Sequence, residues 1–217
     1  MVSAVSERMT VRRGAKRAVH DPSDVHAILR AGSIAHVGVN TDSGPLVLPM
    51  AYGVSDRNMY LHGALANALL HAAIDHEICA TVTIVDGLVV SKTPFNHSMN
   101  YRSVVVRGRA RAVVDPEEVM EALRLMTDHI VPTWETTRAP SPADVRATRI
   151  VALVLDEMSA KVRSGGAVND SVDEGQAIWS GHIPVSSILG SPVSDADAGA
   201  DVPEAVLRVV GADIHDR

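Results

Sequence analysis

The longest strand candidate in the chain is YRSVVVRGRARAVV, residues 101–114. Side chains of a strand alternate between two faces, so the parity of this stretch separates two kinds of residue. One face carries Val104, Val106, Ala110, Ala112 and Val114, and the other carries Arg107, Arg109 and Arg111. We expect the first face to pack in the core and the arginines to meet water, with an anion-binding stripe as the alternative. Such a pattern is typical of an antiparallel sheet.

Shorter strand candidates surround this stretch. The turn residues TDSGP, 41–45, separate two apolar runs and predict a hairpin, and Asp86-Gly87 joins two others at a dipeptide suited to a tight hairpin turn. From Ser164 onward the sequence predicts a loop-like chain. The other predicted strands cover residues 34–39, 46–54, 59–62, 78–85, 88–91 and 150–156.

Helices are predicted between these strands. Asp21 and Asp115 each provide an N-cap directly before a proline, and the two helices that follow end at Gly32 and before Pro132. An alanine-rich segment, 65–74, predicts a third, shorter helix. Because hairpins join the strands and the helices are inserted rather than alternating with them, the pattern predicts an antiparallel barrel or sandwich of the α+β class.

Composition bounds the size of the domain and its partners. Of 217 residues, 46% are hydrophobic and 21% charged, which suits one globular domain with appendages. Aromatic residues make up only 3%, and the formal net charge is −6, so a nucleic-acid partner is not expected. We expect residues 1–10 to form a basic flexible arm and residues 191–217 an acidic C-terminal tail.

The cysteine and histidine content indicates the cellular compartment and bears on metal binding. The single cysteine, Cys79, cannot form an internal disulfide, which fits a reducing compartment. The ten histidines show no recognised ligand spacing, so no metal site is expected. His71 and His76 in particular are expected at the surface of a helix end. Without an apolar run long enough for a membrane span, and without a signal-peptide pattern, the chain is expected to be cytoplasmic.

Two segments are unusual for a plain β domain. In FNHSMNYRS, residues 95–103, polar side chains lead into an apolar strand, and Arg102 shares the parity of the packed face. A guanidinium in that position has either an internal carboxylate partner or a bound anion. In YLHGA, residues 60–64, a strand ends at a glycine before a helix, whose amides can hold a phosphate or can form an ordinary turn.

These segments also carry a resemblance to a known family. The chain resembles the pyridoxamine 5′-phosphate oxidase-related flavin-binding proteins over residues 11–190, and within them the branch related to nitroimidazole-resistance reductases. The segments that match are YLHG (60–63), TVTIVDGLV (81–89), HSMNYRSVVV (97–106) with Gly108, Lys161-Val162-Arg163 and Trp179-Ser180-Gly181.

The resemblance implies a fold, a cofactor and a partner. The fold would be mainly β, an antiparallel Greek-key split β-barrel with a few peripheral helices, occupying residues 11–190. The cofactor would be FMN or, as the alternative, FAD, held in grooves at the interface of a homodimer. The residues that it places around the flavin are Leu48, Pro49, Met50, Ala51, His62, Gly63, Ala64, Asn67, Ser98, Asn100, Tyr101, Arg102, Ser103, Lys161 and Trp179.

One departure from the family pattern concerns the phosphate. Relatives commonly have a hydroxyl residue after His-Gly and a basic residue early in the next helix, whereas this chain has Ala64 followed by LANAL, 65–69. Arg102 or Lys161 would have to compensate. Otherwise the flavin binds weakly, or the site takes a haem or a deazaflavin.

Two functions follow from the resemblance. The first is a flavin-dependent oxidoreductase acting on a small molecule, in which His62 either delivers a proton or only orients the cofactor. The second is a non-catalytic protein that binds or carries a flavin, a deazaflavin or haem.

Overall fold

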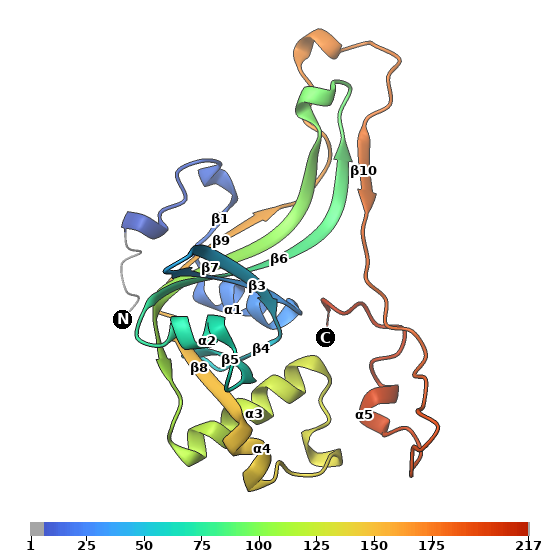
Figure 1. Ribbon diagram of the computed structural model, residues 1–217. Coiled ribbons are helices and arrows are strands. Elements are labelled where there is room, and N and C mark those ends of the chain that lie inside the picture. Colours follow the sequence, from blue (N-terminus) through green and yellow to red (C-terminus); the bar gives the residue numbers. More distant parts are fainter. Residues whose placement is uncertain (1–6, 217) are drawn as a thin grey trace.

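The structure, a computed structural model, describes residues 7–216 (Figure 1). Its strands belong to one antiparallel sheet with the main order β3-β2-β6-β7-β8-β5-β4, while β9 pairs with β7, β1 with β9, and β10 with β6. The two ends of this path do not pair, so the barrel is open, and the predicted mainly β fold is confirmed. The strands are β1 (Ala18–Val19), β2 (Ala35–Thr41), β3 (Gly44–Met50), β4 (Tyr52–Val54), β5 (Asn58–Ala64), β6 (Glu77–Val90), β7 (Ser98–Ala112), β8 (Thr148–Val154), β9 (Glu157–Arg163) and β10 (Gly181–Pro184).

Strand β7 is shared by the two halves of the barrel. Its residues 101–107 pair with β9, whereas residues 110–112 pair with β8. Gly108 lies at the change of partner, and β6 runs along the other edge of β7. Val104, Val106 and Ala110 are buried as predicted, but Val114 lies beyond the end of the strand and is 82% exposed.

Helices cover the sheet where its apolar face is concentrated. Residues of α1 and α2 join the main core, which contains Val25, Leu29, Leu69 and Leu70, and a second cluster forms where α3 packs on β5 and β8. Both predicted N-caps are present, since Asp21 accepts from the Ser23 amide and Asp115 from the amides of the first turn of α3. The helices are α1 (Pro22–Ala31), α2 (Ala68–Ala73), α3 (Pro116–Ile130), α4 (Pro142–Ala147) and α5 (Glu204–Leu207), with short 3-10 turns at Glu7–Met9, Ala15–Arg17, Pro94–Asn96, Trp134–Thr136 and Ser171–Asp173.

The predicted hairpin at Asp86-Gly87 is wrong. These residues lie inside β6, where the register against β7 shifts between Val85 and Gly87, so the dipeptide marks a bulge. A Cβ at Gly87 would lie 3.0 Å from the carbonyl oxygen of Ile183 on β10. The glycine therefore serves the close approach of a neighbouring backbone rather than a turn.

Other boundaries also differ from the sequence prediction. The predicted strand 46–54 divides at Ala51 into β3, which pairs with β2, and β4, which pairs with β5. The segment after Ser164 is not all loop, because β10 pairs with β6. Strand β9 was not predicted, although it lies directly beside β7.

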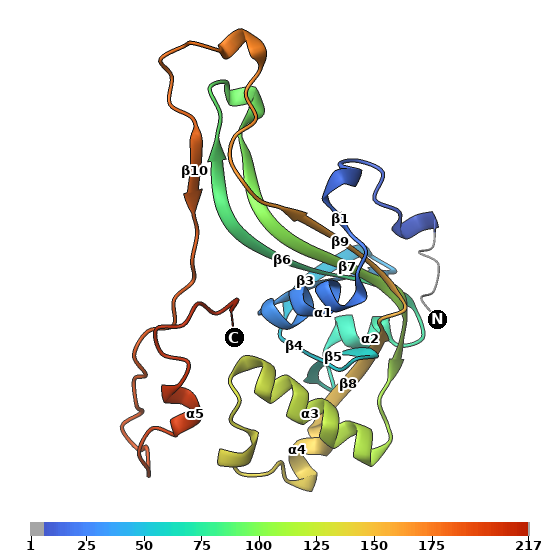
Figure 2. The same cartoon turned by 180° about the vertical axis from the view of Figure 1, so that it is seen from behind.

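A long extension projects from the barrel. The distal halves of β6 and β7 leave the body as a ribbon, and the chain from Ser164 to Pro184 runs out to the tip of this ribbon and back (Figures 1 and 2). We call residues 84–102 and 164–184 the arm. After it the chain passes beside the body through α5, and His215 Nδ1 lies 2.9 Å from the carbonyl oxygen of Ala31 at the end of α1.

The N-terminal segment that the structure describes contacts the body. Arg8 forms ion pairs with Glu77, at 2.6 Å, and with Glu157. Met9 is only 3% exposed. Residues 1–6 of the predicted basic arm lie outside the described residues.

Candidate functional site

The predicted site residues at the end of β5 form a capped strand-to-helix turn. Asn67 Oδ1 accepts a hydrogen bond from the Leu70 amide at 3.0 Å, and the Asn67 amide donates to the carbonyl oxygen of Ala64 at 2.9 Å. A Cβ at Gly63 would lie 2.9 Å from Asn67 Nδ2, which explains the glycine. Asn67 therefore uses its side-chain oxygen to begin α2. The segment thus forms a capped turn, and phosphate binding by its amides stays a prediction.

His62 is the residue of this group whose side chain has an unsatisfied polar atom. Its side chain is half-buried, and no described residue hydrogen-bonds its buried Nδ1. Burial lowers the pKa of the imidazole below its usual 6.5, because the charged form loses solvation. At neutral pH His62 is a neutral imidazole with a free nitrogen.

A second group lies on an outer strand. Leu48, Pro49 and Met50 occupy the end of β3, which pairs with β2 alone, and Ala51 follows as the link to β4. Leu48 is 37% exposed and Pro49 is exposed as well. The outer edge of this strand leaves backbone groups available to a ligand or to another chain.

The third group lies on β7 and β9, at the base of the arm. Asn100 is 6% exposed, and its amide nitrogen donates to the carbonyl oxygen of Gly165 at 3.0 Å. Its amide oxygen accepts from the buried Arg163, so the Asn100 side chain connects β7 to the loop after β9. Ser103 and Lys161 are directly paired across β7 and β9 and are both half-buried.

Arg102 has an internal carboxylate partner. Its Nη2 lies 2.7 Å from Asp86 Oδ1, and its Nε donates to the same carboxylate. Donation to the Asp86 carboxylate raises the pKa of Arg102 above its usual value. The sequence left two possibilities for Arg102, an internal carboxylate or a bound anion. The structure contains the carboxylate, which is that of Asp86 at the β6 bulge.

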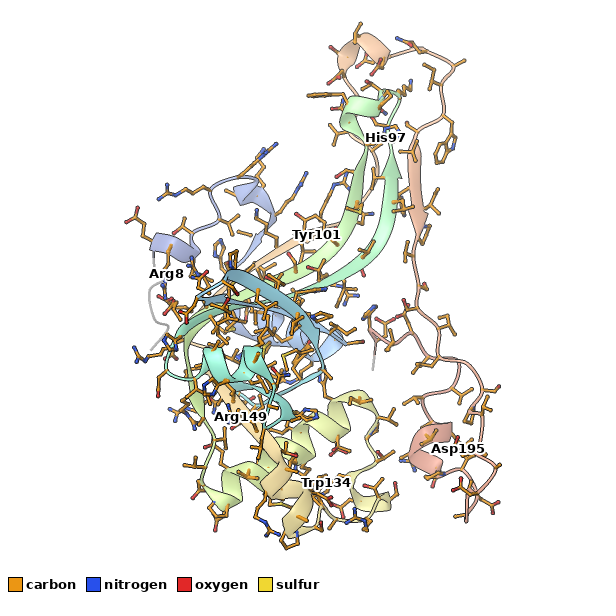
Figure 3. All side chains as sticks on the ribbon, viewed as in Figure 1. Arg8, His97, Tyr101, Trp134, Arg149 and Asp195 are labelled. Atoms are coloured by element: carbon orange, nitrogen blue, oxygen red, sulfur yellow. The ribbon has the colours of Figure 1, made fainter. Side chains whose placement is uncertain are left out.

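The remaining predicted residues lie on the arm. Tyr101 lies where the arm leaves the body, whereas His97 lies near its far end (Figure 3). Ser98 is half-buried, and Trp179 is 63% exposed just before β10. The predicted flavin residues thus form separate groups, on β3, at β5–α2 and on the arm with its base. Within one chain, nothing described gathers them into a single pocket.

Two hollows in the described chain are lined by other residues. The first, of about 520 Å³, lies between the N-terminal segment, α1 and β9. The second, of about 570 Å³, lies beside α2 and the ends of β7 and β8, and we call it the α2 hollow. It is lined by Leu65, His71, Ile74, His76, Ala112, Val113, Val114, Thr148, Arg149 and Ile150.

The α2 hollow adjoins the predicted β5 site. It brings together two histidines and an arginine that sequence analysis did not connect. In the pairing of β5 with β8, His62 faces Ile150 and Gly63 faces Arg149. His71 and His76 are exposed, as predicted, but their common hollow with Arg149 depends on this pairing. His71 and His76 lie more than seventy residues before Arg149 in the sequence, so no local pattern indicated that they share a hollow.

Comparisons with known proteins agree with this architecture. The family model described as pyridoxamine 5′-phosphate oxidase matches residues 21–162. The structure of the flavocytochrome Anf3 from Azotobacter vinelandii is 33% identical, with a TM-score of 0.89, over 94% of this chain and 97% of that one. No curated protein matches the chain.

Two more distant structures share the fold. The FAD and haem binding protein from Mycobacterium smegmatis is 24% identical with a TM-score of 0.86, over 91% of this chain and 98% of that one. A candidate 5-nitroimidazole antibiotic resistance protein from Bacteroides thetaiotaomicron is 24% identical with a TM-score of 0.56, over 67% of this chain and 86% of that one. In the described part of the chain, no helix has the length and apolar character needed to cross a membrane.

Proposed function

The chain belongs to the pyridoxamine 5′-phosphate oxidase family, and on that premise we propose that it is a flavin-dependent oxidoreductase with haem as a second redox group. The observation that carries this proposal is the match with the flavocytochrome Anf3, which extends over 94% of the chain at 33% identity. A flavocytochrome contains both a flavin and a haem. The match includes the arm and the tail as well as the barrel, so the two chains share more than the family core.

The flavin site of this proposal is shared between two copies of the chain. The arm carries exposed apolar side chains, an arrangement that usually marks a binding surface. These are Val85 (36% exposed), Leu88 (46%), Phe95 (92%), Met99 (50%), Val168 (71%), Val172 (78%), Ile178 (48%), Trp179 (63%) and Ile183 (51%). A second copy that covers this surface would bring its own β3 and β5 toward the arm residues, and a symmetric homodimer then contains two such grooves.

Within the groove, each group of residues has a distinct task. When bound, the flavin supplies hydride and single-electron transfer. The free edge of β3 offers backbone groups to a planar ring, and the half-buried imidazole of His62 can accept a proton because it is neutral. Arg102 and Lys161 are the cations that the resemblance offers to the flavin phosphate, although Asp86 already pairs with Arg102.

The flavin of this proposal is FMN, with FAD as the alternative. The turn after β5 has no basic residue, and its capping side chain is engaged with α2, so the phosphate would need Arg102 of the arm or Lys161 of β9. The second candidate function is a carrier that binds its cofactor without turning over a substrate.

A visible spectrum of freshly purified full-length protein tests the proposal. We expect flavin bands together with a haem Soret band, and bleaching of the flavin bands when a reduced nicotinamide is added without oxygen. Flavin bands that persist with every donor would favour the carrier, and a colourless protein would contradict both functions. Chromatography of the extracted cofactor distinguishes FMN from FAD, and light scattering tests the dimer, because a monomer with bound flavin excludes the shared groove.

A further inference from the structure

We propose that the α2 hollow holds the haem, with His76 as the iron ligand and with Arg149 and His71 as the anchors of its carboxylates. The inference rests on the proposed function. It concerns residues that no part of the predicted flavin site uses.

The lining suits a flat apolar ring that carries carboxylates. Six of the ten lining residues are Leu, Ile, Val or Ala, and the polar ones are two imidazoles, one guanidinium and one hydroxyl. Two apolar members are open to solvent, with Leu65 51% and Val114 82% exposed. A volume of about 570 Å³ lies within the range of cofactor sites. No group of three or more His, Cys, Asp or Glu residues in the described chain could hold a bare metal ion, but a haem iron needs only one or two protein ligands.

The backbone holds His76 firmly. Asp75, directly before it, has φ of +60°, the only positive value among described residues other than glycine. The Asp75 amide donates to the carbonyl oxygen of Ala110 at 2.8 Å, and the Ala110 amide donates to the carbonyl oxygen of His76 at 3.0 Å. The turn after α2 is thus fixed to β7 on both sides of His76, which fits a residue that must be kept in place.

The tautomer of His76 leaves the correct nitrogen free. Nδ1 lies 2.9 Å from the carbonyl oxygen of Ile74. A carbonyl only accepts, so Nδ1 carries the proton and Nε2 keeps its lone pair. Histidine ligands of metals typically donate the other ring N–H to a carbonyl or carboxylate in this way.

His71 has the opposite tautomer and therefore a different role. Its Nδ1 lies 2.9 Å from Arg149 Nη1, and a guanidinium only donates, so Nδ1 accepts and the proton is on Nε2. His71 has no lone pair left for iron while this contact exists. Together, His71 and Arg149 present N–H donors, and none of the described carboxylates forms an ion pair with Arg149. A haem carboxylate would supply the missing anion.

The position of the hollow fits electron exchange with the flavin site. Arg149 and Ile150 line the hollow and are directly paired with Gly63 and His62 of β5. The hollow and the predicted flavin turn therefore share the β5–β8 pair.

Haemin titration of the full-length protein tests this assignment by the Soret band, with His76→Ala, His76→Met, His71→Ala and Arg149→Leu beside the wild type. We expect His76→Ala to lose the wild-type Soret spectrum and to regain it with added imidazole, and His76→Met to give a different ligation spectrum. Arg149→Leu should keep the wild-type spectrum but weaken haemin binding by about ten- to a hundredfold, as for a lost charge-assisted contact. His71→Ala should keep the spectrum with a smaller loss.

The controls separate the site from the function. His20→Ala, an exposed histidine at the other hollow, should behave as wild type. A folded His76→Ala that binds haemin with an unchanged spectrum, or loss of the spectrum in His71→Ala, overturns the assignment while leaving the haem proposal intact. A wild type that binds flavin but no haemin overturns both. Circular dichroism verifies that each variant is folded.

Discussion

Among single residues, His62 and Arg102 differ in whether the structure gives their side chains a partner. The buried Nδ1 of His62 has no partner among the described residues, and the strand end is a costly place for an unsatisfied polar atom. Arg102, by contrast, is already paired with Asp86. Nδ1 of His62 is therefore unsatisfied, whereas the guanidinium of Arg102 is paired.

The neutral state of His62 predicts a pH dependence of stability. Its folded pKa is lowered by burial, so the unfolded chain takes up a proton that the folded chain does not once the pH falls below about 6.5. The contribution is fully present above that value and is lost toward acid. We expect His62→Gln to lose less stability between pH 7 and pH 5 than the wild type, measured as the melting temperature at each pH, with the exposed His20→Gln as the control. Parallel curves for wild type and His62→Gln would contradict the buried neutral state.

Arg102 is the residue for which flavin binding and internal pairing compete. If its guanidinium also reaches the phosphate, Arg102→Ala should weaken flavin binding by about 1.5–3 kcal/mol. Asp86→Asn removes only the competitor and should leave binding equal or stronger. The comparison is a flavin titration of both variants, with Arg109→Ala on the exposed face as the control. Equal losses for Arg102→Ala and Arg109→Ala would show that Arg102 is not the anchor.

At the scale of elements, local signals predicted the helices better than the strand boundaries. The caps at Asp21 and Asp115 act within one turn of their helices and were found from the sequence. The bulge at Gly87 depends on β10, almost a hundred residues away in the sequence. The local sequence around Asp86-Gly87 therefore predicted only a hairpin turn. The α2 hollow was missed for the same reason, because Arg149 meets His71 only through the pairing of β5 with β8.

Gly53 on β4 shows the same dependence on a distant element. A Cβ there would lie 2.7 Å from the Met126 nitrogen and 2.9 Å from the Leu125 carbonyl carbon, so α3 would have to move away from β4. We expect Gly53→Ala to destabilise the fold by about 3 kcal/mol, and to lower the melting temperature by roughly 6–12 °C. Gly190→Ala, with nothing within 4 Å, is the control. An unchanged melting temperature for Gly53→Ala would mean that α3 packs less closely than described.

In the whole molecule, the hydrophobic core and the exposed apolar surface of the arm and tail are separate. Neither hydrophobic cluster contains a residue after Ala160 or before Val25. The arm and tail together hold much of the exposed apolar surface, including Trp179 and Ile188. The predicted flavin residues divide between body and arm in the same way, which is why sequence analysis could name them from a resemblance but could not gather them within one chain.

This separation predicts how truncation acts. A chain of residues 11–190 should remain folded and dimeric and should keep its flavin, since both core clusters and all ten strands are retained.

Removing 191–217 alone breaks the contact of His215 with Ala31, worth about 1 kcal/mol, so the melting temperature should fall by roughly 2–4 °C. Removing 1–10 alone exposes the site of Met9 and frees Glu77 and Glu157 from Arg8, so the fall should be larger, roughly 5–10 °C. Thermal melting, light scattering and flavin absorbance of the three truncated chains beside the full one decide this order. Loss of flavin on removal of the tail alone would place residues 191–217 in the partner's groove.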